Sequence, residues 1–210
     1  MMNASINTPL LQVKGLKKVY QTGLLQKRET FRLEADFNID GSQIVGVMGP
    51  NGSGKTTMFE LITGSNQPTS GEVLCAGQNI HNVKYRSRDR LAIHYHQSYQ
   101  VRHFAKTKPS FMLENPITDY PLIHLFDEPQ FNTQDGYIGF MLEFFKKLKS
   151  EGRLVFLCVH PNEEFHVKIM REICDSYLFV QKGRVSQAHD YDNLLQNPDV
   201  SNYLGSLAQY

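Results

Sequence analysis

The hydrophobic residues of this chain are concentrated in short runs that predict a sheet with a helical crossover. The run at 122–126 supplies apolar residues to both faces of a strand, as in a parallel sheet covered on each side. Apolar runs at 44–48 and 154–159 predict further strands, and Gly152 is placed to end a helix before the last of them. The apolar residues with helical spacing in that helix are Ile138, Met141, Leu142, Phe145 and Leu148. This strand–helix–strand order predicts a parallel crossover.

The pattern also predicts a hairpin and one buried polar residue. Apolar residues at 176–180 and 184–185 flank a Lys182-Gly183 turn, which predicts an antiparallel hairpin. His124 is the one polar residue inside the run 122–126, and we interpret it as a hydrogen-bonded histidine of the core.

The segment 49–57, Gly-Pro-Asn-Gly-Ser-Gly-Lys-Thr-Thr, matches a phosphate-binding loop directly after the strand at 44–48. Its glycines let the backbone turn tightly and approach phosphates, and its N–H groups and the following helix N-terminus attract anions. Lys55 is suited to neutralise the β- and γ-phosphates, and Thr56 to ligate Mg²⁺. The chain is therefore predicted to bind a nucleoside triphosphate, or to descend from a protein that did. The predicted nucleotide-binding residues of the segment are Gly49, Asn51, Gly52, Ser53, Gly54, Lys55, Thr56 and Thr57.

Two adjacent carboxylates, Asp127 and Glu128, follow the run at 122–126 and precede Pro129. Successive residues of a strand point to opposite faces of the sheet. Both carboxylates can therefore serve one site only if the strand ends there and the backbone turns, and Pro129 favours that ending.

Composition restricts the class of protein. The 210 residues and 24.1 kDa suit one domain. Lys and Arg number 22 against 21 acidic residues, so a nucleic-acid partner is not expected. Three scattered cysteines without metal-ligand spacing indicate a reducing compartment. Without a signal peptide or an apolar run of about 20 residues, we expect a cytoplasmic protein that meets the membrane only through a partner.

The stretch from Leu10 to Gly77, which includes "LLQVKGLKKVY" and "GSQIVGVMGPNGSGKTTMFELITG", resembles the front half of the nucleotide-binding subunit of ATP-binding-cassette (ABC) transporters. The resemblance implies an α/β P-loop NTPase of the ABC-ATPase type. Its sheet would have a mainly parallel core and an N-terminal antiparallel β portion. Residues 1–210 would form a single ATP-binding domain that takes ATP and Mg²⁺.

The same resemblance implies roles for individual residues. Tyr20 would stack on adenine, a reasonable role for a phenol ring. Asp127 would hold Mg²⁺ through water, and Glu128 would polarise the attacking water. His160, after the strand at 154–159, would contact the γ-phosphate. Gln97 lies 42 residues after Lys55 and would touch both Mg²⁺ and the attacking water, with Gln100 as a weaker alternative. The predicted catalytic residues are thus Glu128, His160, Gln97 and Lys55, and the predicted metal-site residues are Thr56, Gln97 and Asp127.

The chain departs from the family between Gln97 and Pro121. Family members carry there a helical subdomain with a Leu-Ser-Gly-Gly-Gln signature, whereas residues 98–120 contain no Ser-Gly-Gly and include two prolines. We interpret 98–120 as a shortened remnant of that subdomain. The similar run at 74–78 lies too early in the chain and is expected in a hairpin instead. After Glu128, Asp135 or Gln134 is a candidate for the aspartate that contacts the neighbouring subunit in the family.

Three functional hypotheses remain open. The first is an ATP-binding subunit that drives an integral membrane transporter subunit, paired either with a second ATPase subunit that bears the signature or with an unusual membrane subunit. Because the signature is missing, its ATPase activity would be slow or dependent on that partner. The second is a soluble ABC-type ATPase or nucleotide-gated regulatory protein that is not coupled to transport. The third is a non-catalytic binding module, which the filled catalytic positions disfavour.

Overall fold

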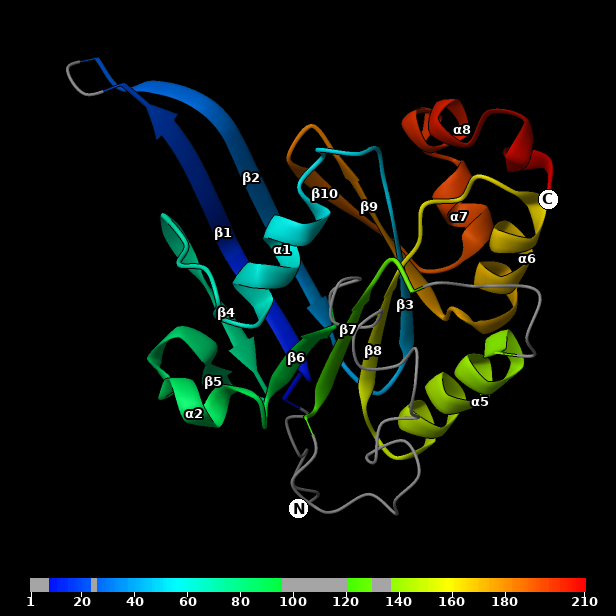
Figure 1. Cartoon of the computed structure of the whole chain (residues 1–210), viewed down its shortest axis with the longest axis horizontal. Helices are drawn as coiled ribbons and strands as arrows, with labels where there is room; N and C mark the ends of the chain where they lie inside the picture. Colours follow the sequence, from blue (N-terminus) through cyan, green and yellow to red (C-terminus); the bar gives the residue numbers. More distant parts are fainter. Residues whose placement is uncertain (1–7, 24–25, 96–120, 130–136) are drawn as a thin grey trace, which may run out of the picture.

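The computed structural model describes residues 8–23, 26–95, 121–129 and 137–210 (Figure 1). Its strands are β1 (Leu11–Thr22), β2 (Arg28–Ile39), β3 (Ile44–Met48), β4 (Ser70–Cys75), β5 (Gln78–Asn79), β6 (Ala92–Tyr95), β7 (Ile123–Asp127), β8 (Leu154–Cys158), β9 (Ser176–Gln181) and β10 (Arg184–Ala188). Its α-helices are α1 (Lys55–Ile62), α2 (Tyr85–Arg88), α5 (Tyr137–Ser150), α6 (Glu164–Ile173), α7 (Tyr191–Leu195) and α8 (Pro198–Leu204). Two short 3₁₀ helices lie at Ile80–Asn82 and Gly205–Gln209. No helix of the described ranges is long and apolar enough to cross a membrane.

The described strands form one sheet in the order β5-β4-β1-β2-β10-β9-β3-β8-β7-β6. Strands β9, β3, β8, β7 and β6 pair in parallel, whereas β1, β2, β4 and β5 pair antiparallel. The predicted combination of a mainly parallel core and an N-terminal antiparallel portion is confirmed. The hairpin predicted around 182–183 is also present, as the antiparallel pair β9–β10. The run at 74–78 lies in the β4–β5 hairpin, as expected.

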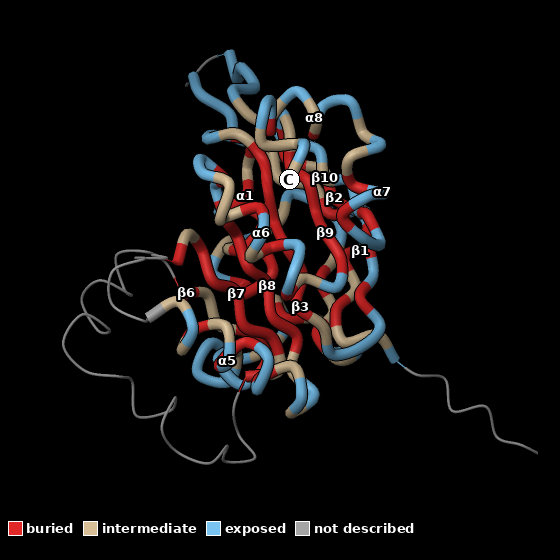
Figure 2. The backbone as a smooth tube through the Cα atoms, turned by 90° about the vertical axis from the view of Figure 1, so that its right-hand side faces the viewer, coloured by how far each residue is buried: buried red, intermediate tan, exposed pale blue. Residues whose placement is uncertain are grey.

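Helices cover the two faces of the parallel strands (Figure 1). Helix α1 packs on one face, in a hydrophobic cluster that includes Met58 and Phe59. Helices α5 to α8 pack on the other face, in a second cluster that includes Phe145 and Met170. Figure 2 shows β3, β7 and β8 as buried segments between these layers. Burial on both faces is the physical reason that these strands are apolar throughout.

Helix α5 and the strand after it form the predicted crossover. The helix ends in a Schellman motif, since the N–H of Arg153 donates to Leu148 O and the N–H of Gly152 to Lys149 O, both at 3.0 Å. The chain then enters β8, which pairs in parallel with both β3 and β7. The carboxyl ends of these three strands therefore meet at one edge of the sheet, and Cys158 is in register with both Val47 and Asp127.

His124 is a core histidine, as predicted. Its ring is fully buried in β7, and Nδ1 lies 3.1 Å from the hydroxyl of Tyr95. Burial, and secondarily the positive charge of Arg153, lowers the pKa of His124 to about 3. The imidazole is therefore neutral at physiological pH and stacks beside Tyr95 and Phe126 in the apolar layer under α5.

Candidate nucleotide and magnesium site

The phosphate loop connects β3 to α1 at the edge where the parallel strands end. Gly49 has φ 147°, and a Cβ atom on it would lie 2.0 Å from the carbonyl oxygen of Val180. Gly54 has φ 112°, and a Cβ atom there would lie 2.9 Å from the ring of Phe31. A side chain at Gly49 would therefore collide with the backbone of β9, and one at Gly54 would have an unfavourable φ and press on the ring of Phe31, which explains why the loop needs glycine there.

Lys55 begins α1 with its side chain folded back over the loop. Only 6% of the residue is exposed, and Nζ donates to the carbonyl oxygens of Gly49 at 2.7 Å and Pro50 at 3.0 Å. These contacts hold a positive charge inside the curve of the loop. The adjoining cavity of about 330 Å³ is lined by Phe31, Asn51, Gly52, Gly54, Lys55, Thr56, Thr57 and Glu128.

A cluster of polar groups connects α1 to β7. The hydroxyl of Thr56 donates to Oδ2 of Asp127 at 3.0 Å, and Nε2 of His94 lies 3.2 Å from the same oxygen. Burial by itself would raise the pKa of Asp127. Hydrogen bonds with His94, Cys158 and Thr56 outweigh that effect and hold the pKa below its ordinary value. The carboxylate is thus kept ionised inside the protein.

Glu128 lies at the point where β7 ends and the chain turns. Its φ of 50° places it in the left-handed region, and its N–H donates to Cys158 O at 3.0 Å. This turn brings the carboxylate of Glu128 to the cavity of the phosphate loop, while Asp127 faces Thr56. The predicted end of the strand and turn of the backbone at this pair are therefore present, whereas the joint role of the two carboxylates stays a prediction.

The residues of this cluster fit a magnesium ion. A threonine hydroxyl and a carboxylate supply the hard oxygen ligands that Mg²⁺ prefers, and Mg²⁺ keeps several waters when so few protein ligands bind it. The hydroxyl of Ser53, in the middle of the phosphate loop, is buried without a hydrogen-bond partner among the described residues. Such a group is suited to a ligand oxygen that enters the loop.

His160 and Tyr20 are not among the residues that line this cavity. His160 follows β8, is exposed, and has Nδ1 at 2.8 Å from the hydroxyl of Tyr203. Tyr20 is in register with Phe31 across β1 and β2, with ring centroids 6.2 Å apart, and its hydroxyl accepts from Asn66 at 2.8 Å. An adenine contact by Tyr20 therefore stays a prediction, and Phe31 is the aromatic residue that borders the loop.

Several predicted positions lie outside the described residues. These are Gln97, its alternative Gln100, the interval 98–120, and the candidates Gln134 and Asp135. Their roles stay predictions.

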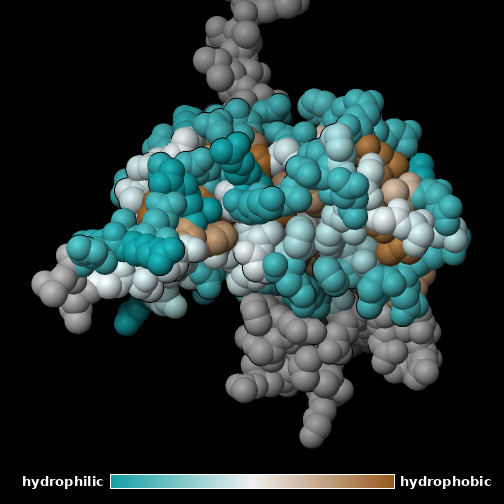
Figure 3. All heavy atoms as spheres, turned by 90° about the horizontal axis from the view of Figure 1, so that it is seen from above, coloured by the Kyte–Doolittle hydropathy of each residue, from teal (hydrophilic) through white to brown (hydrophobic). Residues whose placement is uncertain are grey.

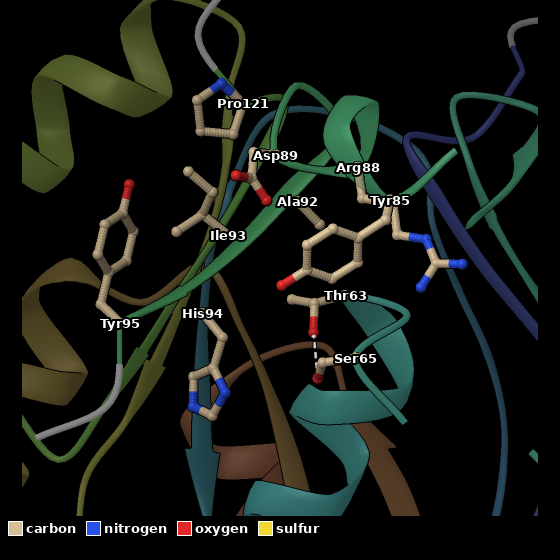
Figure 4. A pocket seen from close by; sticks show the side chains of 10 residues that line it. All are labelled: Thr63, Ser65, Tyr85, Arg88, Asp89, Ala92, Ile93, His94, Tyr95 and Pro121. Atoms are coloured by element: carbon tan, nitrogen blue, oxygen red, sulfur yellow. Dashed lines mark hydrogen bonds between the residues drawn. The ribbon is translucent and has the colours of Figure 1, made fainter. Parts of the chain in front are cut away.

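The sequence pattern missed three residues of the site: Phe31, His94 and Tyr203. Each is brought to the site by pairing or packing with a distant segment. For His94, the available signal was a histidine in the "LAIHYHQ" stretch, where apolar residues alternate with polar ones. Figure 4 shows that the side chains of His94 and Tyr95 leave β6 in opposite directions, as alternation along a strand requires.

A second cavity, of about 510 Å³, lies on the outer side of His94 (Figure 4). Its lining residues are Thr63, Ser65, Tyr85, Arg88, Asp89, Ala92, Ile93, His94, Tyr95 and Pro121. His94 therefore lies between this cavity and Asp127.

The surface seen from above in Figure 3 is mainly hydrophilic, with small hydrophobic areas between the polar ones.

Comparisons with known proteins agree with the family that the sequence resembles. The family model "ABC transporter" matches residues 33–153. The phosphonates import ATP-binding protein PhnC 2 of Halalkalibacterium halodurans is 31% identical over 108 residues, which are 51% of this chain and 41% of that protein. The ATP-binding protein ChvD of Rhizobium radiobacter is 42% identical over 72 residues, which are 34% of this chain and 23% of that protein. This chain thus spans less than half the length of either relative.

Solved structures share the fold. A structure described as the ATP-binding subunit of an ABC transporter has a TM-score of 0.62 at 19% identity, covering 94% of this chain and 99% of that one. The ADP conformation of MJ1267, an ATP-binding cassette of an ABC transporter, has a TM-score of 0.66 at 16% identity, covering 93% and 98%.

Proposed function

Because this chain belongs to the ABC transporter family, we propose that it binds Mg-ATP at the 49–57 loop and hydrolyses it to drive a membrane partner. The observation that carries the proposal is the contact between Thr56 and Asp127, which lies next to the phosphate loop and its buried lysine. The sheet that joins residues 11 to 188 supports the further proposal that 1–210 form one ATP-binding domain.

The residues of the site would share the chemistry in the following way. Backbone N–H groups of the loop and Nζ of Lys55 would hold the phosphates, with the lysine turning from Gly49 O and Pro50 O toward them. Thr56 and Asp127 would hold Mg²⁺, which when bound neutralises charge on the transferred phosphoryl group. Glu128 would orient and polarise the attacking water from its place on the cavity wall. Gln97 and His160 would complete the site around the water and the γ-phosphate.

Turnover by this chain alone would be slow. A signature segment presents hydrogen-bond donors to the γ-phosphate from a second subunit, and no Ser-Gly-Gly sequence occurs in these 210 residues. In related P-loop enzymes, groups supplied in trans are worth roughly 10³–10⁵ in rate. We therefore propose, besides the integral membrane subunit, a second ATPase subunit that contributes a signature. The chain would then lie at the cytoplasmic face of the membrane.

The first experiment measures nucleotide binding. ATP affinity of the wild-type chain is compared with that of Lys55→Ala in the presence of Mg²⁺, by calorimetry or a fluorescent ATP analogue. Lys84→Ala, which removes an exposed lysine from the start of α2, is the matched control. We expect Lys55→Ala to weaken binding at least about tenfold, since it removes the buried charge from the phosphate site. Near-normal affinity in Lys55→Ala would exclude the assigned site.

A second function is favoured by one observation, the short interval 98–120. The family's helical subdomain contributes to the groove that docks the membrane subunit, and only 23 residues are available here. A soluble ABC-type ATPase or nucleotide-gated regulatory protein would not need that groove. Affinity purification from the native cell in mild detergent distinguishes the two functions. A co-purifying multi-span membrane protein supports the transporter subunit, whereas recovery from the soluble fraction alone supports the second function.

A further inference from the structure

We propose that Tyr203, in the last α-helix, is a positioning residue that fixes the imidazole of His160 with its proton on Nε2. The hydroxyl of Tyr203 lies 2.8 Å from Nδ1 of His160, although the two residues are 43 positions apart. The contact joins the end of the chain to the edge of the sheet that carries the phosphate loop. Its consequence for catalysis rests on the proposed function, whereas the contact itself can be tested without nucleotide.

The hydroxyl of Tyr203 is placed to act as the donor. Burial raises the pKa of Tyr203 to about 12. The hydroxyl therefore keeps its proton throughout the physiological range. A phenol has one proton to donate, and Nδ1 of His160, at 2.8 Å, lies within hydrogen-bond distance of it.

A proton donated to Nδ1 determines the tautomer of the ring. A neutral imidazole carries one proton, so an Nδ1 that accepts a hydrogen bond leaves the ring proton on Nε2. Nε2–H is then a hydrogen-bond donor, which is the form that can bind an anionic phosphate oxygen. The other tautomer would present a lone pair to that oxygen and repel it.

The position of Tyr203 is set by the packing of α8. Val200 and Leu204 of this helix are buried in the core, and the side chain of Asn197 caps its first turn by accepting from Asp199 N at 3.0 Å. The ring of Tyr203 packs against Phe179 of β9, with centroids 5.7 Å apart. The hydroxyl is therefore held by a packed helix and not by a freely rotating surface side chain.

His160 in turn lies close to the phosphate loop. It comes two residues after β8, which pairs with β3 so that Val47 is in register with Cys158. The loop begins directly after β3, and the N–H of Val159 donates to Val47 O at 3.1 Å. Tyr203 thus contacts a histidine that follows the strand paired with β3, which leads into the loop.

The test measures the tautomer directly. The full chain is labelled with ¹⁵N in its eight histidine rings, and two-bond ¹H–¹⁵N correlation spectra are recorded at pH 8, where an ordinary imidazole is neutral. The His160→Gln spectrum assigns the His160 signals. Tyr203→Phe keeps the ring and its contact with Phe179 but removes the hydroxyl. Tyr191→Phe is the matched control in the neighbouring helix α7, because its hydroxyl is buried without a partner among the described residues.

We expect His160 in the wild type to show an unprotonated, hydrogen-bonded Nδ1 and a protonated Nε2. In Tyr203→Phe both signals should move toward a mixture of tautomers, while Tyr191→Phe leaves them in place. A proton on Nδ1 in the wild type, or His160 signals unchanged in Tyr203→Phe, would overturn the proposal.

ATP turnover supplies a second measurement. Loss of one neutral hydrogen bond should lower kcat about two- to tenfold in Tyr203→Phe, with little change in KM for ATP. Tyr191→Phe should leave both constants unchanged. Equal kcat in Tyr203→Phe and wild type would overturn the catalytic part of the inference. If the wild type binds no ATP, the proposed function fails, and the spectra still decide whether Tyr203 fixes the ring.

Discussion

Nε2 of His94 and the hydroxyl of Thr56 both contact Oδ2 of Asp127, at 3.2 and 3.0 Å. A residue of β6 thus helps to orient the carboxylate that β7 supplies to the proposed magnesium site. The His94 ring also packs edge-on against Phe59 of α1, with centroids 5.4 Å apart. Its position is therefore set by the core on one side and by Asp127 on the other.

Replacing His94 by alanine should weaken the response to magnesium. Asp127 would lose one of the groups that orient its carboxylate and lower its pKa. Removing such an outer partner of a metal ligand costs about 10- to 100-fold in metal affinity in other sites. We expect the Mg²⁺ concentration that half-saturates ATP binding to rise about tenfold, measured by titration at constant ATP. The control His189→Ala removes an exposed histidine after β10. Equal Mg²⁺ titrations for His94→Ala and wild type would contradict a role for His94.

Glu128→Gln should separate binding from hydrolysis. The amide preserves the size of the side chain on the cavity wall but cannot polarise water as a carboxylate does. ATP affinity should remain within about threefold of wild type, while single-turnover hydrolysis falls at least about 100-fold. Glu163→Gln, at the exposed start of α6, is the matched control. Retained turnover in Glu128→Gln would remove this residue from its proposed role.

Gly49→Ala should destabilise the protein and disrupt the phosphate loop. The new Cβ would lie 2.0 Å from the backbone oxygen of Val180, and a φ of 147° is unfavourable for alanine. We expect a loss of about 2 to 4 kcal/mol in the free energy of unfolding, measured by denaturant titration.

Gly139→Ala is the control for that substitution. Gly139 is exposed in α5 with no atom within 4 Å of an added Cβ, so alanine should stabilise the helix by about 0.5–1 kcal/mol. Similar effects of the two substitutions would contradict the close approach of Val180 to the loop.

His124 should make stability depend on pH. Its pKa falls from an ordinary 6.5 to about 3 in the folded protein, mainly through burial. Between these values the unfolded chain binds a proton that the folded chain does not, so the free energy of unfolding rises with pH. The contribution of His124 is therefore complete above about pH 6.5 and is lost as the pH falls toward 3.

His124→Phe tests this dependence, because phenylalanine keeps an aromatic ring in the stack with Tyr95 and Phe126. Between about pH 4 and 6, the slope of the unfolding free energy should fall by about 1.4 kcal/mol per pH unit relative to wild type. His189→Asn, in an exposed position, serves as the control. An unchanged slope in His124→Phe would show that another group dominates the acid sensitivity.

Much of the architecture could be predicted because it depends on neighbours in the chain. The phosphate loop is one continuous segment between an apolar strand and a helix, and its glycines and lysine act through local backbone geometry. The pair Asp127-Glu128 was likewise predictable, since only a turn at the strand end lets adjacent carboxylates share a site, and Glu128 makes that turn with φ 50°. The helix over 137–150 was evident from apolar spacing and from the glycine that follows it.

The contacts of Asp127, His160 and Gly54 could not be predicted in this way. His94 reaches Asp127 because β6 pairs with β7, Tyr203 reaches His160 because α8 packs beside β9, and Phe31 borders Gly54 because β2 passes the loop. Each contact joins residues at least 23 positions apart, and a single sequence carries no periodic signal for such a distance.

The sequence by itself therefore determined the family, the phosphate loop and the two carboxylates, because backbone conformation and strand patterning act over a few residues. Only the tertiary structure decided which side chains orient those groups. Orientation depends on register between strands and on helix packing, where a displacement of one residue would turn His94 away from Asp127 and toward the opposite face of the sheet.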